Sequence, residues 1–330
     1  MNLENIFTVR TLRGRLTSTL VVTAIMLAFC LISIPTIVQA KNLCKSTAQN
    51  TRISCGFEGR ADYRLACAKC DNLANPEERK ACKQEAQEEL KEKIKECQEQ
   101  YIARIELCDD LGPDPYDPEI RPDDFMSIEE MINEPNPYVP LNPGTCRTYK
   151  AETEEGTETI EVCATDDTRE ILGVECMVVR DTVTLDEELI EDTFDYYAQD
   201  LDGNLWYFGE NSYSYEDDRI VSVEGSWIAG VDGAKAGIIM YEDPQIGDLY
   251  RQEFLPGEAE DMAEVLALEE TVEVPYGYFD KNCVRTKDFT PIEPDVEEQK
   301  YYAPGVGVVL EVDVETGERV ELVDIHPITP

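Results

Sequence analysis

Six of the twelve cysteines form two sets whose spacings mirror each other, and the chemistry that this pattern favours is disulfide formation. Steps of 11 and 15 residues separate Cys44, Cys55 and Cys70, and steps of 15 and 11 separate Cys82, Cys97 and Cys108. On an α-helix both steps return to within about 60° of the starting direction, so each set lies on one helical face. The sequence therefore predicts an antiparallel helical hairpin stapled by Cys44–Cys108, Cys55–Cys97 and Cys70–Cys82.

Four cysteines in the C-terminal part supply two further pairs. Cys146 and Cys163 flank a short turn at residues 153–156, which would place them opposite each other in a β-hairpin. Cys176 and Cys283 are then paired by elimination, since spacing alone does not prove connectivity.

Cys67 is left over as a free thiol, with a Cys67–Cys82 bridge and a free Cys70 as the alternative. The favoured interpretation of the odd cysteine is a small buried hydrophobe, because free cysteine is among the most buried residue types. An intermolecular disulfide through Cys67 and a reactive site are the other interpretations. Zinc binding is disfavoured because the cysteines have mirror partners in a chain expected to be exported.

Catalytic chemistry is constrained by the single histidine, His326, which lies beside Pro327 near the C-terminus. The sequence therefore offers no histidine outside the C-terminal region for a histidine-activated nucleophile or for a histidine metal site. A pair of carboxylates could support hydrolysis, but 70 acidic residues give no means of locating it. We expect a non-catalytic binding or structural protein without a catalytic or cofactor-binding residue; the alternative is a carboxylate-dependent hydrolase of an extracellular polymer.

Asp200, Asp202 and Asn204 alternate as the oxygen ligands of a calcium loop do. The bidentate glutamate expected at the twelfth position is absent, since Asn211 lies there. A hairpin turn explains the same residues and is favoured. A calcium-stabilised structural protein is the third functional hypothesis, and no other cofactor is expected.

Six aromatic residues could line an apolar or sugar-binding surface, although alternation along strands favours a core role. They are Trp206, Tyr207, Phe208, Trp227, Tyr301 and Tyr302.

The N-terminus predicts export. Three arginines precede an apolar run at residues 20–38, and small residues ending at Ala40 are typical of a signal-peptidase site. Residues 1–40 are therefore expected to be a signal peptide, and membrane anchoring by an uncleaved segment at residues 16–38 is the alternative. The expected location is extracellular, periplasmic or at the cell surface.

The strongly negative net charge of the chain limits the kinds of partner that it can bind. Loss of three arginines and Glu4 with the signal peptide changes the net charge from −41 to −43. Such a field repels nucleic acid and anionic membrane surfaces. The expected partner is a protein or an apolar small-molecule ligand.

Composition divides the exported chain into a cysteine-rich helical hairpin at 41–111, an acidic proline-rich linker at 112–144, a β domain at 145–327 and a tail at 328–330. Gly56 and Gly59 each cost about 1 kcal/mol inside a helix, so a break is expected there. The linker carries eight prolines and is expected to be semi-extended, with at most a short helix at residues 127–132.

Period-two alternation predicts antiparallel strands after the linker. Residues 310–314 and 319–322 flank a turn at 315–318 and form a β-hairpin, and similar signals occur at 146–166, 174–184, 190–209 and 219–228. The expected fold class is α+β: a disulfide-stapled antiparallel helical hairpin followed by a mainly antiparallel β domain, as a curled sheet, barrel or sandwich.

Distinctive short phrases of the chain lie at residues 136–144, 202–210, 224–227, 257–262 and 301–307. They resemble a group of uncharacterised secreted bacterial proteins, in which a cysteine-rich helical segment precedes a β domain. The resemblance implies secretion and the type of fold, and it transfers no functional residue.

Overall fold

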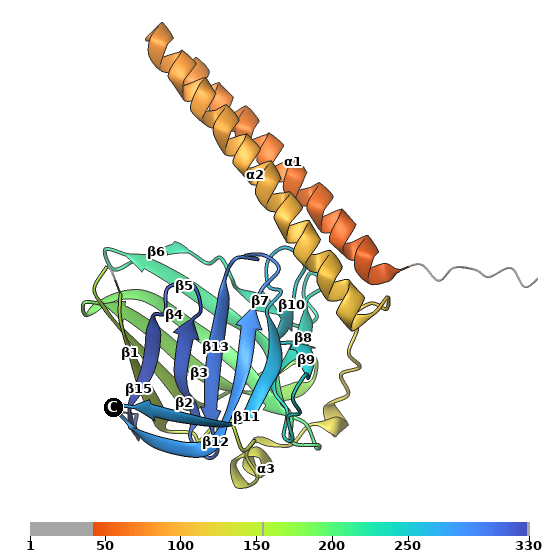
Figure 1. Ribbon diagram of the computed structural model, residues 1–330, viewed down its shortest axis with the longest axis vertical. Helices are drawn as coiled ribbons and strands as arrows, with labels where there is room; N and C mark the ends of the chain where they lie inside the picture. The colour runs from red at the N-terminus through yellow and green to blue at the C-terminus, as the bar shows by residue number, and fades with distance from the viewer. Residues whose placement is uncertain (1–41, 154, 329–330) are drawn as a thin grey trace, which may run out of the picture. The chain divides into compact units, whose positions relative to one another are not determined.

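The computed structural model describes residues 42–153 and 155–328. A hairpin of two long helices precedes a large antiparallel sheet (Figure 1), and the expected α+β fold is confirmed. The expected signal peptide or anchor, residues 1–40, lies outside the described residues. Among the described helices, none combines the length and apolar character that a membrane span requires.

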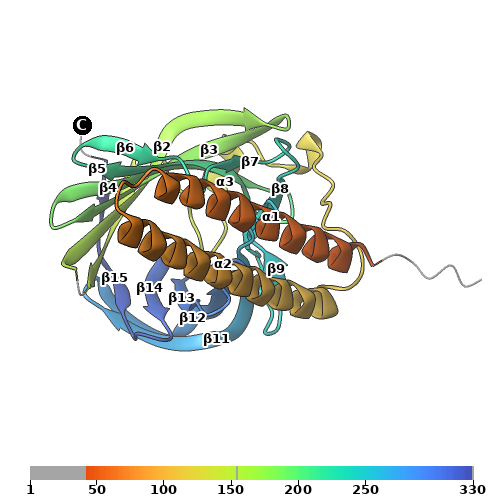
Figure 2. The same cartoon turned by 90° about the horizontal axis from the view of Figure 1, so that it is seen from above.

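The two helices of the hairpin are α1 (Leu43–Asp71) and α2 (Pro76–Leu111). Asn42 and Asn75 cap their N-termini by accepting a backbone N–H with their side chains, which satisfies donors that a helix leaves unpaired. Figure 2 shows the helices running side by side. The three mirror-related disulfides are confirmed, with Cα–Cα distances between 5.6 and 5.8 Å.

The expected break at Gly56 and Gly59 is wrong, because α1 is continuous through both glycines. Both are buried, and a Cβ on Gly59 would lie 2.9 Å from Lys93 Cγ on α2. A Cβ on Gly56 would lie 3.7 Å from Ile94 Cδ1. Gly59 therefore lets the two helices approach closely, and the disulfides offset the helix-propensity cost on which the expected break was based.

The segment between hairpin and sheet contains the 3₁₀-helix η1 (Pro122–Asp124) and the helix α3 (Ile128–Asn133). Ser127 and Glu130 form a reciprocal capping box at the start of α3, close to the short helix that was expected. Met131 and Leu141 are buried in a cluster with residues of the sheet. Much of this segment is therefore part of the folded core.

Fifteen antiparallel strands follow in the part of the chain that the structure describes. Their bounds are β1 (Thr145–Glu152), β2 (Thr157–Ile171), β3 (Val174–Leu185), β4 (Glu188–Gln199), β5 (Leu205–Glu216), β6 (Arg219–Ser222), β7 (Trp227–Ile228), β8 (Lys235–Met240), β9 (Leu249–Arg251), β10 (Glu253–Phe254), β11 (Met262–Val274), β12 (Gly277–Phe289), β13 (Glu297–Ala303), β14 (Gly307–Asp313) and β15 (Arg319–Pro327).

The sheet curls until its two ends meet. Its strand order runs β10-β8-β5-β4-β3-β2-β1-β15-β14-β13-β12-β11-β9, with β6 and β7 as side branches on β5. The terminal strands β10 and β9 are separated in sequence by Gln252 alone, so the closure is made by one continuous segment. Gly237 on β8 allows this segment to approach, since a Cβ there would lie 2.2 Å from Gln252 O.

The cysteines of the sheet follow the expectation in part. Cys146 and Cys163 are directly paired across β1 and β2 and form the expected disulfide. The Cys176–Cys283 pairing is wrong: both are free, buried thiols in separate hydrophobic clusters, on β3 and β12. Burial raises the pKa of Cys176 to about 12 and that of Cys283 to about 11, so both act as small hydrophobes.

The free thiol expected at Cys67 is confirmed; it lies half-buried on α1.

Candidate functional site

A cavity of about 420 Å³ lies within the curled sheet and is lined by side chains from strands around its circumference. Its apolar wall includes Val139, Leu141, Ile160, Val162, Val179, Ile239, Val308 and Val320. Tyr149, Tyr197, Tyr207 and Tyr302 add aromatic surface with a polar tip. A cavity of this size and lining is suited to holding a small molecule.

Charged residues reach the cavity because side chains alternate along a strand. Val179 and Asp181 are two residues apart on β3 and both line it, as do Asp195 and Tyr197 on β4. Lys300 and Tyr302 repeat the pattern on β13. The charged groups therefore occupy positions that an ordinary sheet fills with hydrophobic residues.

Acids outnumber bases in this lining. The acids are Asp181, Asp195, Glu253, Asp261 and Glu311, and the bases are Arg147 and Lys300. Arg147 is 7% exposed, and its guanidinium donates to the carbonyls of Val306 and Pro140, both at 2.7 Å. These hydrogen-bond partners of Arg147 are neutral carbonyls and not carboxylates. The positive charge of Arg147 is therefore not paired directly with an acid of the lining.

Asp195 and Glu210 share one hydroxyl. Tyr207 Oη lies 2.6 Å from Asp195 Oδ1 and 3.1 Å from Glu210 Oε2. Burial raises the pKa of Asp195 to about 7, and burial with the nearby Asp195 charge raises the pKa of Glu210 to about 8. The hydrogen bond from Tyr207 opposes both shifts. Both acids therefore change their protonation state near neutral pH.

Lys300 is the central cation. Its Nζ lies 3.4 Å from Glu311 and 3.9 Å from both Asp288 and Glu298. The Glu311 carboxylate holds the pKa of Lys300 well above its usual range, against the opposing effect of burial. Burial raises the pKa of Glu298 to about 7. One ammonium is thus shared among several carboxylates.

Asp181 has no such partner. Its Oδ1 atom is buried without a hydrogen-bond partner among the described residues. Burial, with Asp195 and Glu191 nearby, raises the pKa of Asp181 well above its usual range. A buried acceptor without a donor costs free energy, and a donor supplied by a ligand would recover it.

Sequence reasoning missed this set of residues. Acidic residues occur throughout the chain, so Asp181 and Asp195 did not stand out. The signal that could have found them is the alternation of side chains along a strand. Asp181 is two residues from Val179, and Lys300 is two residues from Tyr302, so each lies on the same inward face as its neighbour.

The expected calcium ligands form a turn between β4 and β5. Asp200 Oδ1 accepts the backbone N–H groups of Asp202 and Asn204, at 3.0 and 2.8 Å. Asp200 Oδ2 accepts from Asn204 Nδ2 and from Trp206 Nε1, and Asn204 Oδ1 accepts from the backbone of Glu242. These contacts are those of the favoured interpretation, a hairpin turn.

Among the described residues, the one cluster with metal-ligand spacing is Cys146, Glu161 and Cys163, and its two sulfurs are joined in a disulfide.

The aromatic residues divide between core and cavity. Phe208 and Trp227 are buried in a hydrophobic cluster, as the core interpretation expected. Tyr207 and Tyr302 are also buried, but they line the cavity. Tyr197 stacks on Tyr207, with ring centroids 4.9 Å apart.

Comparisons of the chain with protein-family models, with curated proteins and with solved structures find no match.

Proposed function

We propose that the protein is an exported, non-catalytic binding protein whose curled sheet holds a small ligand with an apolar body and a cationic amine. Four intramolecular disulfides indicate an oxidising compartment, which supports export to the extracellular space or cell envelope. The observation that carries the proposal is the cavity of about 420 Å³ with carboxylates at inward positions.

The chemistry of the lining selects the ligand. Aliphatic and tyrosine side chains offer area for an apolar body, and the excess of acids favours a positive charge. Asp181 Oδ1 lacks a donor that an ammonium group carries. A bound cation would lower the pKa values that burial raises, so binding would release protons and strengthen as pH rises towards 8.

Calorimetric titration with hexylamine, hexanoate and 1-hexanol tests this proposal. Hexylamine is expected to bind more tightly than the two probes of equal chain length. Asp181→Asn keeps the shape of the side chain but removes its charge, and it is expected to raise the dissociation constant for hexylamine about 10-fold. Glu175→Gln removes an exposed carboxylate on the same strand and is the matched control.

Failure of all three probes to bind would contradict the small-molecule proposal. Tighter binding of hexanoate would contradict the choice of a cation. Equal losses in the Asp181→Asn and Glu175→Gln variants would show that the cavity is not where hexylamine binds.

A second candidate function is carboxylate-dependent hydrolysis of an extracellular polymer, and the Asp195–Tyr207–Glu210 arrangement favours it. Carboxylate oxygens that share one hydroxyl lie within about 6 Å of each other, near the separation of about 5–5.5 Å used by retaining glycosidases. The raised pKa values would provide one protonated and one ionised acid near neutral pH.

Release of reducing ends from a panel of soluble polysaccharides tests this second candidate. Hydrolysis that is lost in both Asp195→Asn and Glu210→Gln, and kept in Glu175→Gln, would establish it. No release by the unmodified protein, or release that survives both substitutions, would exclude it.

A further inference from the structure

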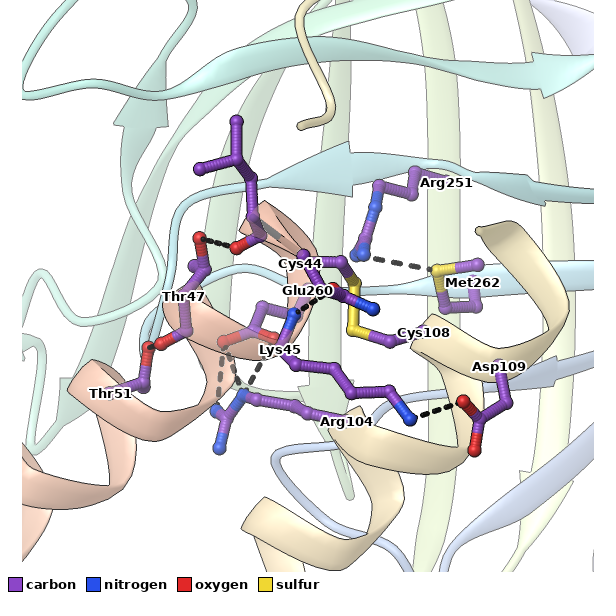
Figure 3. Close-up of a disulfide and its surroundings, with 12 residues drawn as sticks. Cys44, Lys45, Thr47, Thr51, Arg104, Cys108, Asp109, Arg251, Glu260 and Met262 are labelled. Atoms are coloured by element: carbon purple, nitrogen blue, oxygen red, sulfur yellow. Dashed lines mark hydrogen bonds and ion pairs between the residues drawn. A yellow bond between two sulfur atoms is a disulfide. The ribbon is translucent and has the colours of Figure 1, made fainter. Parts of the chain in front are cut away.

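A second cavity, of about 500 Å³, lies where the hairpin meets the sheet. Residues of α1 and α2 form one side, near the Cys44–Cys108 disulfide, and β8, β9 and β10 contribute to the other. Its lining is rich in rings, including Tyr116, Trp206, Tyr241, Tyr250 and Phe254. Figure 3 shows the part of this region around the disulfide.

Arg104 and Glu260 both line this cavity, and they neutralise each other. Arg104 Nε and Nη2 each donate to the Glu260 carboxylate at 2.8 Å, and Arg104 and Glu260 are 5% and 2% exposed. Glu260 also accepts the backbone N–H of Gly257 at 2.6 Å. The carboxylate of Glu260 is thus fully engaged, while Arg104 Nη1 is buried without a partner in the described part of the chain.

Arg251 also lines the cavity, and it has no carboxylate partner among the described residues. It is 8% exposed, and its Nε is buried without a hydrogen-bond partner within residues 42–153 and 155–328. Its guanidinium lies 4.4 Å from the ring centroid of Phe254 and 5.6 Å from that of Tyr116. Its Nη1 contacts the Met262 sulfur at 3.6 Å, drawn as a dashed line in Figure 3.

A buried cation without a counter-charge destabilises a protein, and a hydrogen-bonded anion removes that cost. Burial lowers the pKa of Arg251 and the Arg104 charge adds to this effect, although Glu260 opposes it. Stacking on aromatic rings compensates only in part for lost hydration. An anion in this cavity would therefore meet the guanidinium of Arg251, which has no carboxylate partner among the described residues.

We infer that this cavity is a second binding site, which takes a small organic carboxylate with an aromatic or other flat apolar body. The planar fork of Arg251 matches a carboxylate, and the rings of Tyr116 and Phe254 offer stacking area. A polyanion is disfavoured, because the net charge of −41 repels it at long range whereas a single small charge meets a local cation. The inference does not depend on the function proposed for the cavity within the sheet.

Calorimetric titration of the full exported chain with benzoate, benzylamine and benzyl alcohol tests the inference. Benzoate is expected to bind most tightly of these three ring compounds. Arg251→Met keeps an unbranched apolar chain and removes the charge, and it is expected to raise the dissociation constant for benzoate about 10-fold or more. Arg180→Met is the matched control, since Arg180 pairs with Asp192 away from this cavity.

A melting curve without ligand separates binding from a structural role. If the role of Arg251 is ligand binding, Arg251→Met removes an unpaired buried charge. It is then expected to raise the melting temperature of the ligand-free protein and to reduce the rise in melting temperature that benzoate causes. Arg251→Lys keeps the charge without the planar fork and is expected to weaken benzoate binding less than Arg251→Met.

An unchanged benzoate affinity in Arg251→Met would overturn the inference, as would benzylamine binding more tightly than benzoate. A lower melting temperature in Arg251→Met, with no benzoate binding by the unmodified protein, would assign Arg251 a structural role. None of these outcomes bears on hexylamine binding, so the two cavities are tested separately.

Discussion

The hairpin and the curled sheet reach stability by different routes. Three of the four disulfides lie in the hairpin, where the buried residues of the two helices are few and mostly cysteine, alanine or glycine. The sheet has one disulfide and four hydrophobic clusters. Covalent links replace a core where two polar helices bury little surface, whereas the sheet packs hydrophobic clusters around a mainly apolar cavity that carries inward carboxylates.

Reduction of the disulfides should give the largest difference in stability between the hairpin and the sheet. The Cys44–Cys108 link spans 64 residues and constrains the unfolded chain by about 4 kcal/mol in the chain-entropy account. We expect a reducing agent to lower the melting temperature of the helical signal in circular dichroism. Fluorescence should change much less, because both tryptophans, Trp206 and Trp227, lie in the sheet part.

The double substitution Cys146→Ser and Cys163→Ser controls for the disulfide of the sheet. Coincident loss of both signals on reduction would contradict the division into two kinds of stability.

Truncation of a buried side chain should destabilise the sheet more than the hairpin. Phe208 is 0% exposed and packs edge-to-face on Phe125, with ring centroids 5.4 Å apart. Phe208→Ala is expected to lower the free energy of unfolding of the sheet by about 3–5 kcal/mol. Leu90→Ala, at a half-buried position of α2, is expected to cost about 1 kcal/mol. Urea titrations followed by fluorescence and by circular dichroism give the two values, and similar costs would contradict the contrast.

Acidity should also act on the sheet more than on the hairpin. The pKa values of Asp195 and Glu210, about 7 and about 8 in the fold, lie above those of the unfolded chain. The folded state then binds more protons between about pH 4 and 8, so stability falls as pH rises through this window. We expect a higher melting temperature by fluorescence at pH 5 than at pH 8.

The double substitution Asp195→Asn and Glu210→Gln should flatten this pH dependence. The exposed Glu175→Gln variant controls for general repulsion among the acids. A pH dependence that the double substitution leaves unchanged would show that Asp195 and Glu210 do not cause it.

The two hairpin glycines give a smaller and more local test. A Cβ on Gly56 would meet the flexible end of Arg60 at 3.3 Å, whereas one on Gly59 would lie 2.9 Å from Lys93 Cγ, near the α2 backbone. Gly56→Ala should therefore gain about 0.5–1 kcal/mol from helix propensity. Gly59→Ala should lose that gain by separating the helices, as thermal melting of the helical signal would report. Equal effects would mean that close approach does not constrain Gly59.

The sequence allowed the hairpin to be predicted because its constraint is local and periodic. Mirror spacing identifies partners without knowledge of the rest of the fold, as Cys55 and Cys97 show. Cys176 and Cys283 were paired only by counting, and the order of strands places them in different clusters. Propensity alone suggested a break at Gly59, because the close approach of α2 could not be seen from α1.

The two candidate cavities depend on contacts between distant segments, and they could not be predicted. Arg104 and Glu260 are 156 residues apart, and nothing in the spacing of either residue indicates the other. Asp181 and Lys300 meet the same cavity only because the sheet closes through Gln252. Alternation revealed strands, but closure determined which face became the interior.

Removal of calcium with a chelator should have the smallest effect on the stability of the sheet. It tests whether a metal at the turn between β4 and β5 adds to that stability. Both carboxylate oxygens of Asp200 already accept N–H groups, so a calcium ion would have to displace the donors of Asn204 and Trp206. We expect a chelator to leave the melting temperature by fluorescence unchanged, and Asp200→Ala to lower it by removing these bonds. A drop on chelation that added calcium reverses would instead support the calcium-stabilised alternative, and a metal would then join the hydrophobic clusters as a source of stability in the sheet.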